Sequence, residues 1–324
     1  MFRRILIVTI SIALGTFLII NMGSQSEAAG EKYDLRWGTI TAGGAWQIIG
    51  AAMLEDVKKS NPNITGSCVP STTTSNVIGV HQGKFAIGFT LSDTLADAWE
   101  GKGYFTQFGS LQDIRILAVL YPQATQIVVW ADSKIISVDQ MKGLKVSPGA
   151  KGLSCDLELQ RLLNLYGLSY KDVQIQFLSF EDAANQLIDN HIDVFSCTTC
   201  PFPFGPVINV NSQRQIRLLS IPDDKIAELT KFRGVEAYTL PSGLYKGVDY
   251  PVKGIAVRAV IIARKDMPDE IAYSIVKAIG ENFKRYPTVL KAMEYAKFED
   301  MAKNIGFPLH PGALKYYRER GLAK

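Results

Sequence analysis

The chain has 324 residues, of which 47% are hydrophobic and 20% charged, and its formal net charge is +4. This hydrophobic content excludes an intrinsically disordered chain. A net charge this small, with Lys and Arg scattered among Asp and Glu, gives no support for a nucleic-acid partner. The length exceeds what a single hydrophobic core usually organises, so we expect two lobes.

Residues 1–29 have the three-part pattern of a secretory signal peptide. Arg3 and Arg4 supply positive charge, residues 5–20 are mostly apolar, and small residues follow, with cleavage expected after Ala28 or Ala29. We therefore expect export to the periplasm and removal of this segment. An apolar run of this length could instead remain as an N-terminal membrane anchor, which is the alternative.

From residue 33 the hydrophobic pattern alternates between strand and helix periods. The first set of expected elements comprises strand 35–40, helix 45–58, strand 64–69, helix 75–82, strand 85–90, helix 94–100 with Ser92 as N-cap, and strands 114–121 and 127–131 separated by Pro122. Such alternation builds an α/β fold with a parallel sheet flanked by helices.

A second set of similar units follows. It comprises strand 145–147, a helix capped by Ser154, strand 173–178, a helix opened by a capping-box variant at Ser179, strand 193–197, strand 254–263, helix 270–283 and a last helix from Pro311. If strand 254–263 returns the chain to the first lobe, lobe 1 comprises residues 31–122 and 256–324, and lobe 2 comprises residues 123–255. The two crossings would then form a hinge beside a cleft.

Cysteines are present at four positions: Cys68, Cys155, Cys197 and Cys200. The C-x-x-C spacing of the last two suits either a redox dithiol or half of a zinc site, but the three histidines form no second ligand pair, so no metal is expected. Pro201 and Pro203 predict a loop, whereas a redox motif would open a helix. We expect a Cys197–Cys200 disulfide or two free loop thiols, and the state of Cys68 and Cys155 is left open.

The chain contains no recognisable catalytic motif. G-x-S-x-G, H-E-x-x-H, Walker A and G-x-G-x-x-G patterns are all missing from the sequence. His191 lies beside Asp189 and Asp193 in what reads as a solvated turn. We therefore expect a protein that is not an enzyme and needs no cofactor.

The informative segments are four loops between strand ends and helix starts: residues 39–50, 71–75, 147–154 and 197–203. Glycines and hydroxyl side chains in them would deliver a ligand to backbone N–H groups at helix N-termini, which suits a carboxylate. Taken singly, each could be an ordinary β–α turn. Ligands of open α/β sheets bind beyond the carboxyl ends of strands, so we expect the four loops to meet in one cleft. The expected ligand-binding residues are Thr41, Gly43, Gly44, Ala45, Trp46, Thr72, Thr73, Thr74, Ser92, Tyr121, Gly152, Leu153, Ser154, Thr198, Thr199 and Phe202.

Over residues 33–324 the chain resembles the TAXI family, the solute receptors of one class of tripartite ATP-independent periplasmic (TRAP) transporters. The resemblance is carried by an ordered set of stretches: Gly43-Gly-Ala-Trp46 with Gly50, Leu91-Ser-Asp93, Ala98-Trp-Glu-Gly101, Leu117-Ala-Val-Leu-Tyr-Pro122, Ala131-Asp-Ser133, Phe177-Leu-Ser-Phe180, Ile192-Asp193, Val257-Arg-Ala259 and His310-Pro-Gly-Ala313.

The resemblance implies a two-lobed type II periplasmic binding protein fold that closes on a small organic acid, such as glutamate, glutamine or a related carboxylate, and delivers it to TRAP permease subunits. We expect a monomer. The chain departs from the family pattern at Trp46 and Gln47, where two tyrosines are usual, and at the loop with two cysteines, so the fold carries over from the family but the identity of the ligand does not. The alternatives are a receptor for an ABC importer, an exported enzyme, or a thiol-redox protein on the same scaffold.

Overall fold

The computed structural model describes residues 32–40 and 44–324. The predicted signal peptide, residues 1–29, therefore lies outside the described residues, as do Thr41 and Gly43 of the predicted site. Within the described part, no helix combines the length and apolar character needed to cross a membrane.

Strands and helices alternate along most of the chain. The strands are β1 (Tyr33–Gly38), β2 (Ile64–Val69), β3 (Ile87–Leu91), β4 (Ile114–Trp130), β5 (Lys145–Ser147), β6 (Gln174–Ile175), β7 (Val194–Thr199), β8 (Ile216–Leu218), β9 (Val235–Leu240) and β10 (Val252–Arg264). The α-helices are α1 (Ala45–Ser60), α2 (Thr73–His81), α3 (Ser92–Glu100), α4 (Ser154–Leu165), α5 (Phe180–Ile188), α6 (Gly205–Gln213), α7 (Asp223–Leu229), α8 (Asp269–Glu281), α9 (Tyr286–Val289) and α10 (Pro311–Glu319). Short 3₁₀ helices are η1 (Gly103–Phe108), η2 (Val138–Met141), η3 (Phe283–Arg285), η4 (Lys291–Tyr295) and η5 (Phe298–Ala302).

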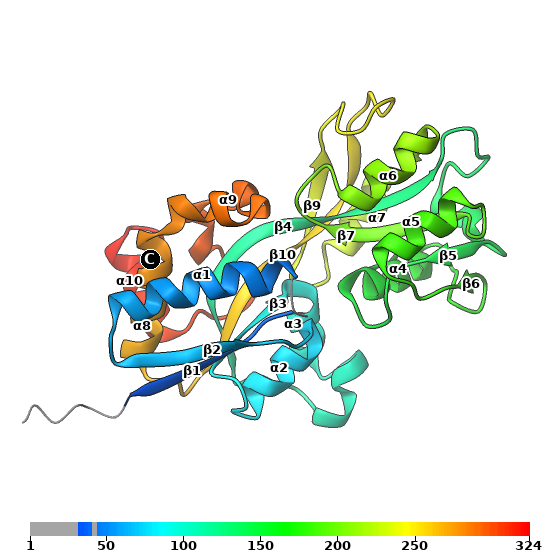
Figure 1. The fold of residues 1–324 in the computed structure, drawn as a ribbon. Coiled ribbons are helices and arrows are strands. Elements are labelled where there is room, and N and C mark those ends of the chain that lie inside the picture. The colour runs from blue at the N-terminus through cyan, green and yellow to red at the C-terminus, as the bar shows by residue number, and fades with distance from the viewer. Residues whose placement is uncertain (1–31, 41–43) are drawn as a thin grey trace, which may run out of the picture. The chain divides into compact units, whose positions relative to one another are not determined.

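The strands of the described residues join in one mixed sheet with the order β2-β1-β3-β10-β4-β7-β5-β6, in which β8 also pairs with β4 and β9 with β10. The strands β2, β1 and β3 are parallel, as are β7, β5 and β6, whereas β4 and β10 pair antiparallel with each other and with their neighbours. The fold is thus two parallel α/β lobes joined through two long antiparallel strands, and Figure 1 shows β4 and β10 running from one group of helices to the other.

The two long strands form the connection between the lobes. The first half of β4 pairs with the second half of β10 in lobe 1, while its second half pairs with β7 and β8 in lobe 2. The prediction of two strands separated by Pro122 was wrong, because one strand continues through this residue. Pro122 lies opposite Arg258, next to a register shift between Arg258 and Val260, and such an irregularity accommodates a residue that has no N–H to donate.

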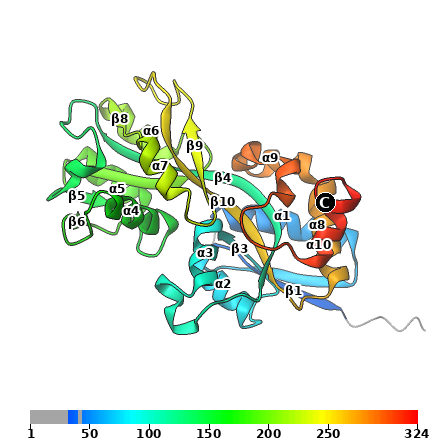
Figure 2. The same cartoon turned by 180° about the vertical axis from the view of Figure 1, so that it is seen from behind.

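Helices cover both faces of each lobe because both faces of the central strands are apolar. Nearly every residue of β4 and β10 is buried. In lobe 1, α8 packs between α1 and α10, and Figure 2 shows these helices gathered on the side of the sheet opposite α2. In lobe 2, α4 packs against α7 and α5 against α6.

Most predicted elements are confirmed, with ends shifted by a few residues. The predicted N-caps at Ser92 and Ser154 were wrong: each is the first residue of its helix and makes no capping hydrogen bond. Ser179 does cap α5, accepting from the Asp182 N–H. The expected strand 173–178 is reduced to the two residues of β6. The lobe boundaries themselves stay a prediction.

Candidate functional site

A pocket of about 460 Å³ lies where the two lobes meet. Its lining consists of Ile40, Gly44, Ala45, Trp46, Thr73, Leu91, Tyr121, Gln123, Leu153, Ser154, Cys155, Phe180, Glu181, Thr198, Thr199, Cys200 and Phe204. These residues come from the carboxyl ends of β3 and β7, from the segments that follow β1 and β2 in lobe 1 and β5, β6 and β7 in lobe 2, and from the middle of β4. The pocket therefore occupies the carboxyl ends of both parallel strand sets, where ligands of open α/β sheets bind.

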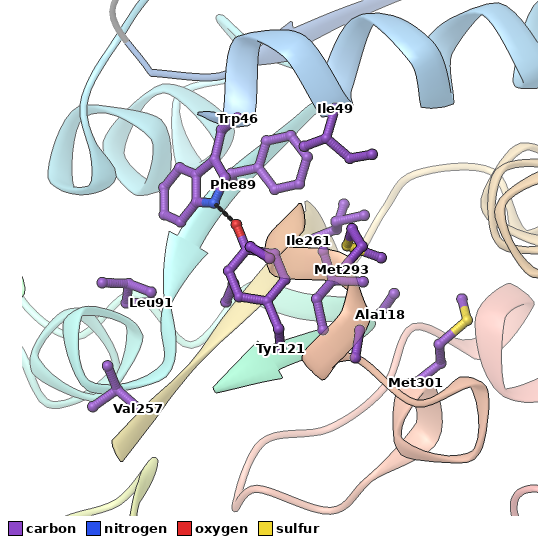
Figure 3. Packing of buried hydrophobic residues seen from close by; sticks show 14 of the residues in the cluster. Trp46, Ile49, Phe89, Leu91, Ala118, Tyr121, Val257, Ile261, Met293 and Met301 are labelled. Carbon is purple, nitrogen blue, oxygen red and sulfur yellow. Dashed lines mark hydrogen bonds between the residues drawn. The ribbon is translucent and has the colours of Figure 1, made fainter. Parts of the chain in front are cut away.

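The lobe 1 wall is built around Trp46, on the first turn of α1. The Trp46 ring stacks on Phe89 of β3, with centroids 5.4 Å apart, and its indole N–H donates to the Tyr121 hydroxyl at 2.8 Å. Figure 3 shows this bond together with the buried side chains around it. Tyr121 is fully buried, and no acceptor for its own hydroxyl proton is recorded among the described residues. A buried hydroxyl of this kind can donate to an acceptor in the pocket.

The start of α2 supplies a second donor. Thr72 caps this helix by accepting from the Ser75 N–H at 3.2 Å, so the next residue, Thr73, opens the helix with its backbone N–H unused by the helix itself. The Thr73 side chain is 4% exposed, and its hydroxyl has no hydrogen-bond partner in the described part of the chain. An unpartnered buried hydroxyl is costly unless a ligand or water satisfies it.

The start of α4 contributes Ser154, which joins the two lobes. Its hydroxyl lies 2.7 Å from Oδ2 of Asp93 on α3 and 3.0 Å from Oε1 of Glu158, one turn further along α4. The other Glu158 oxygen accepts from Thr198 of β7 at 2.6 Å and from Thr125 of β4. Two buried carboxyl groups, one from each lobe, therefore lie within hydrogen-bond distance of the same serine hydroxyl.

The protonation of Glu158 follows from this arrangement. Burial, reinforced by the neighbouring Asp93 carboxylate, raises the pKa of Glu158 from 4.5 to about 7. A serine hydroxyl has one proton and cannot donate to both carboxylates at once. A protonated Glu158 removes the conflict, because it donates to Ser154, and Ser154 then donates to Asp93.

Arg161 forms the other interlobe contact of this network. It lies on α4, two turns after Ser154, and donates to Asp97 of α3 at 2.7 Å, with Asp93 at 3.5 Å. Burial still raises the pKa of Asp97 despite the opposing effect of Arg161. The guanidinium therefore sits between two α3 carboxylates and links the lobes directly beside the pocket.

The structure places nine of the predicted ligand residues in the pocket lining: Gly44, Ala45, Trp46, Thr73, Tyr121, Leu153, Ser154, Thr198 and Thr199. They represent all four of the predicted loops and the hinge. Gln123, Phe180, Glu181 and Phe204 also line the pocket, and the sequence reasoning did not name them.

Five other predicted residues lie outside the lining. Ser92 connects α3 to β10, accepting from the Arg258 N–H at 2.8 Å and donating to the Gly234 carbonyl. Thr72 caps α2, and Thr74, next to Thr73 on the same helix, is not part of the pocket lining. Gly152 adopts a φ of +83° in the turn before α4, and Phe202 packs edge-on against Tyr295 in the lobe 2 core.

All four cysteines are free thiols. Of the two outcomes expected for the C-x-x-C pair, the structure has the free one, with Cys197 inside β7 and the Cys200 thiol directed at the Ala292 carbonyl. Burial raises the pKa of the Cys155 and Cys197 thiols well above the usual range. Protonated, buried thiols are poor nucleophiles.

The Asp93–Ser154–Glu158–Arg161 network was not predicted from the sequence, although the spacing of three of its residues indicates it. Ser154, Glu158 and Arg161 are spaced four and three apart, which places them on one helical face. A polar stripe beginning at a helix start that borders a cleft indicates a site, whereas the partner Asp93 could only be found from the fold. Among the described residues, no cluster of three or more His, Cys, Asp or Glu could hold a metal ion.

Comparison with solved structures identifies the fold. XAC2383 from Xanthomonas citri, in a structure bound to ATP, matches with a TM-score of 0.54 and 14% identity over 90% of this chain and 97% of that chain. The periplasmic sulfonate-binding protein SsuA of a sulfonate ABC transporter from Methylobacillus flagellatus KT matches with a TM-score of 0.51 and 16% identity over 90% of this chain and 88% of that chain. At these identities the likeness shows the fold alone.

The fold is thus that of the periplasmic solute-binding proteins, with the pocket at the junction of the lobes. The chain belongs to the NMT1-like family, whose sequence model matches residues 37–321. The narrower assignment to the TAXI family stays a prediction.

Proposed function

We propose that this chain is an exported receptor that binds a small organic acid in the pocket between its lobes and delivers it to a membrane permease. The observation that carries the proposal is that Thr73 and Tyr121, two residues of the pocket lining, each have a buried hydroxyl for whose proton the described residues offer no acceptor. The first turns of α1, α2 and α4 border it as well, and helix N-termini favour anions.

The lining is adequate for useful affinity. Micromolar binding requires about 8 kcal/mol. Each helix start contributes about 0.3 to 1 kcal/mol, or more when partly buried. Burial of roughly 200 Å² of apolar surface against side chains such as Trp46 and Phe180 would supply about 5 kcal/mol more. Both kinds of contact are therefore needed.

The partner follows from the sequence resemblance. The likeness to the TAXI family supports a TRAP permease as the recipient of the solute and a periplasmic location for the receptor. An ABC importer would use the same fold with a different membrane partner. The neighbouring genes distinguish the two: genes for TRAP membrane subunits support the proposal, whereas a gene for a transport ATPase contradicts this part of it.

Binding is tested by a thermal-shift screen of amino, keto and other organic acids with the mature protein. A true ligand should raise the melting temperature in proportion to the logarithm of its concentration. Trp46→Ala should weaken the effect, whereas Trp99→Ala, which removes an aromatic ring packed against Phe307 outside the pocket, should not. Absence of any stabilising acid would contradict the proposal. Chemical conversion of the ligand during incubation would instead support an enzyme.

A further inference from the structure

The pocket is unusual for a site that is meant to hold an acid, because none of the lining residues that the structure describes has a cationic side chain. Of the described lining residues, only Glu181 has a charged side chain, and it is negative. A bound anion must therefore be held by hydrogen bonds and helix dipoles alone.

Acidic groups directly behind the lining reinforce this bias. Asp93 and Glu158 lie within hydrogen-bond distance of Ser154, which borders the pocket, and Asp97 lies just beyond. Arg161 is the one cation of this cluster, and it is already engaged with the α3 carboxylates. With Glu158 protonated, the carboxylates of Asp93 and Asp97 still outnumber the single Arg161 cation, so an anionic group at the α4 end would face net negative charge.

The donors that await an acceptor lie on the lobe 1 side. The Thr73 hydroxyl is buried and has no hydrogen-bond partner among the described residues. Thr73 is also the first residue of α2, a helix of nine residues. The Tyr121 hydroxyl accepts from the Trp46 N–H, and its own proton has no acceptor among the described residues. These groups suit one carboxylate, or a similar anion of single charge.

The remaining walls are mainly apolar. Ile40, Trp46 and Leu91 line the lobe 1 side, and Phe180 and Phe204 line the lobe 2 side. The two phenylalanines pack edge to face, with centroids 5.5 Å apart, so they form one continuous apolar surface. Such a surface matches a hydrocarbon or aromatic group and leaves a second carboxylate without hydrogen bonds or water.

We infer that the solute has an apolar body and a single anionic head, held at Thr73 and Tyr121, and that dicarboxylates are rejected. This inference rests on the proposed receptor function and narrows it, because it removes the glutamate-like acids from the candidates. The head lies on lobe 1, and the body lies between Trp46 and the Phe180–Phe204 surface.

Calorimetric titration of matched acids tests the inference on the mature protein after removal of any co-purified solute. The pairs are 5-methylhexanoate with glutarate and 2-amino-5-methylhexanoate with glutamate, which differ by an isopropyl group in place of the second carboxylate. We expect the apolar member to bind at least about 100-fold more tightly in the preferred pair, because the second carboxylate would be buried unpaired.

The outcomes separate the two proposals. Equal or tighter binding of glutarate and glutamate overturns the inference and leaves the receptor function intact. Failure of every mono- and dicarboxylic acid to bind at millimolar concentration overturns the receptor function for organic acids, and the inference with it.

A matched pair of variants tests where the head lies. Thr73→Val and Thr74→Val each replace a buried, unpartnered hydroxyl on the first turn of α2, but only Thr73 lines the pocket. Both should fold with unchanged or slightly higher stability, since the lost hydroxyl had no partner. Thr73→Val should weaken binding of the apolar monoacid about 10-fold, and Thr74→Val should leave it unchanged. Equal affinities of the two variants overturn the placement of the head.

Discussion

Glu158 makes the interlobe network sensitive to pH, and Glu158→Gln tests this. Burial, with Asp93 as the second cause, raises the pKa of the Glu158 carboxyl from 4.5 to about 7 in the folded protein. Between these pH values the folded chain holds a proton that the unfolded chain has released. Stability therefore falls as the pH rises from about 4.5 to about 7 and stays lower above that range.

The expected effect is large enough to measure. The difference between 4.5 and about 7 corresponds to about 3 kcal/mol of unfolding free energy. Glutamine has the shape of a protonated glutamate and can donate to Ser154, but it cannot ionise. The stability of Glu158→Gln relative to the wild type should therefore increase by about 3 kcal/mol between pH 4.5 and pH 8. Urea unfolding followed by tryptophan fluorescence across this range gives both curves.

Taking the difference in unfolding free energy between the two proteins at each pH removes the contributions of the other titrating groups, which both proteins share. Glu294→Gln, which removes an exposed carboxylate away from the pocket, is the control and should remain parallel to the wild type. If the Glu158→Gln curve is also parallel to the wild type within about 1 kcal/mol, Glu158 is ionised throughout, and the proton-sharing account of Ser154 is refuted.

Three further predictions concern the surrounding structure. Arg161→Met leaves two α3 carboxylates without their cation and should lower the unfolding free energy by about 3 to 5 kcal/mol in denaturant titrations, whereas Arg264→Met, at a half-buried arginine paired with Asp266, should cost less than about 1 kcal/mol. Tyr121→Phe leaves the Trp46 N–H without an acceptor, so thermal unfolding should show a loss of about 1 to 3 kcal/mol, and an unchanged melting temperature would contradict the bond. Titration of thiols in denaturant without reductant should find all four cysteines, whereas two would reveal a disulfide; the native protein should react slowly because Cys155 and Cys197 are buried and desolvation raises the pKa of all four thiols.

Sequence patterns predicted the fold well where periodicity was strong. The apolar run of β10 and the amphipathic pattern of α8 are examples, and both elements lie within two residues of their predicted limits. No elements were predicted from Gly205 to Leu240. The helices and strands there are only three to nine residues long, which is too short for a hydrophobic period to be recognised in the sequence. Pro122 was misread as a strand boundary, since nothing in the sequence reveals the neighbouring register shift.

The pocket was predictable only in part. Loops that follow parallel strands meet at one edge of a sheet whatever their sequence, so the convergence of the four loops could be expected from the strand and helix order. Which side chain of a loop lines the pocket depends on the orientation of the first turn of the following helix. In the structure Thr73 lines the pocket and Thr74 does not, and the sequence could not distinguish them. The role of Asp93 depends on α3 of one lobe meeting α4 of the other, a contact between segments that are about sixty residues apart.

Because β4 and β10 run through both lobes, the chain cannot be divided at the lobe boundary without cutting both strands. β10 pairs with β3 of one lobe and β9 of the other, and β4 pairs with β10 along its first half and with β7 and β8 along its second. A fragment cut at the boundary would keep truncated strands with bare edges, which invite pairing with other chains. Neither half is therefore a self-sufficient folding unit, and genetic exchange between relatives that keeps both strands whole should preserve foldability better than exchange of a single lobe.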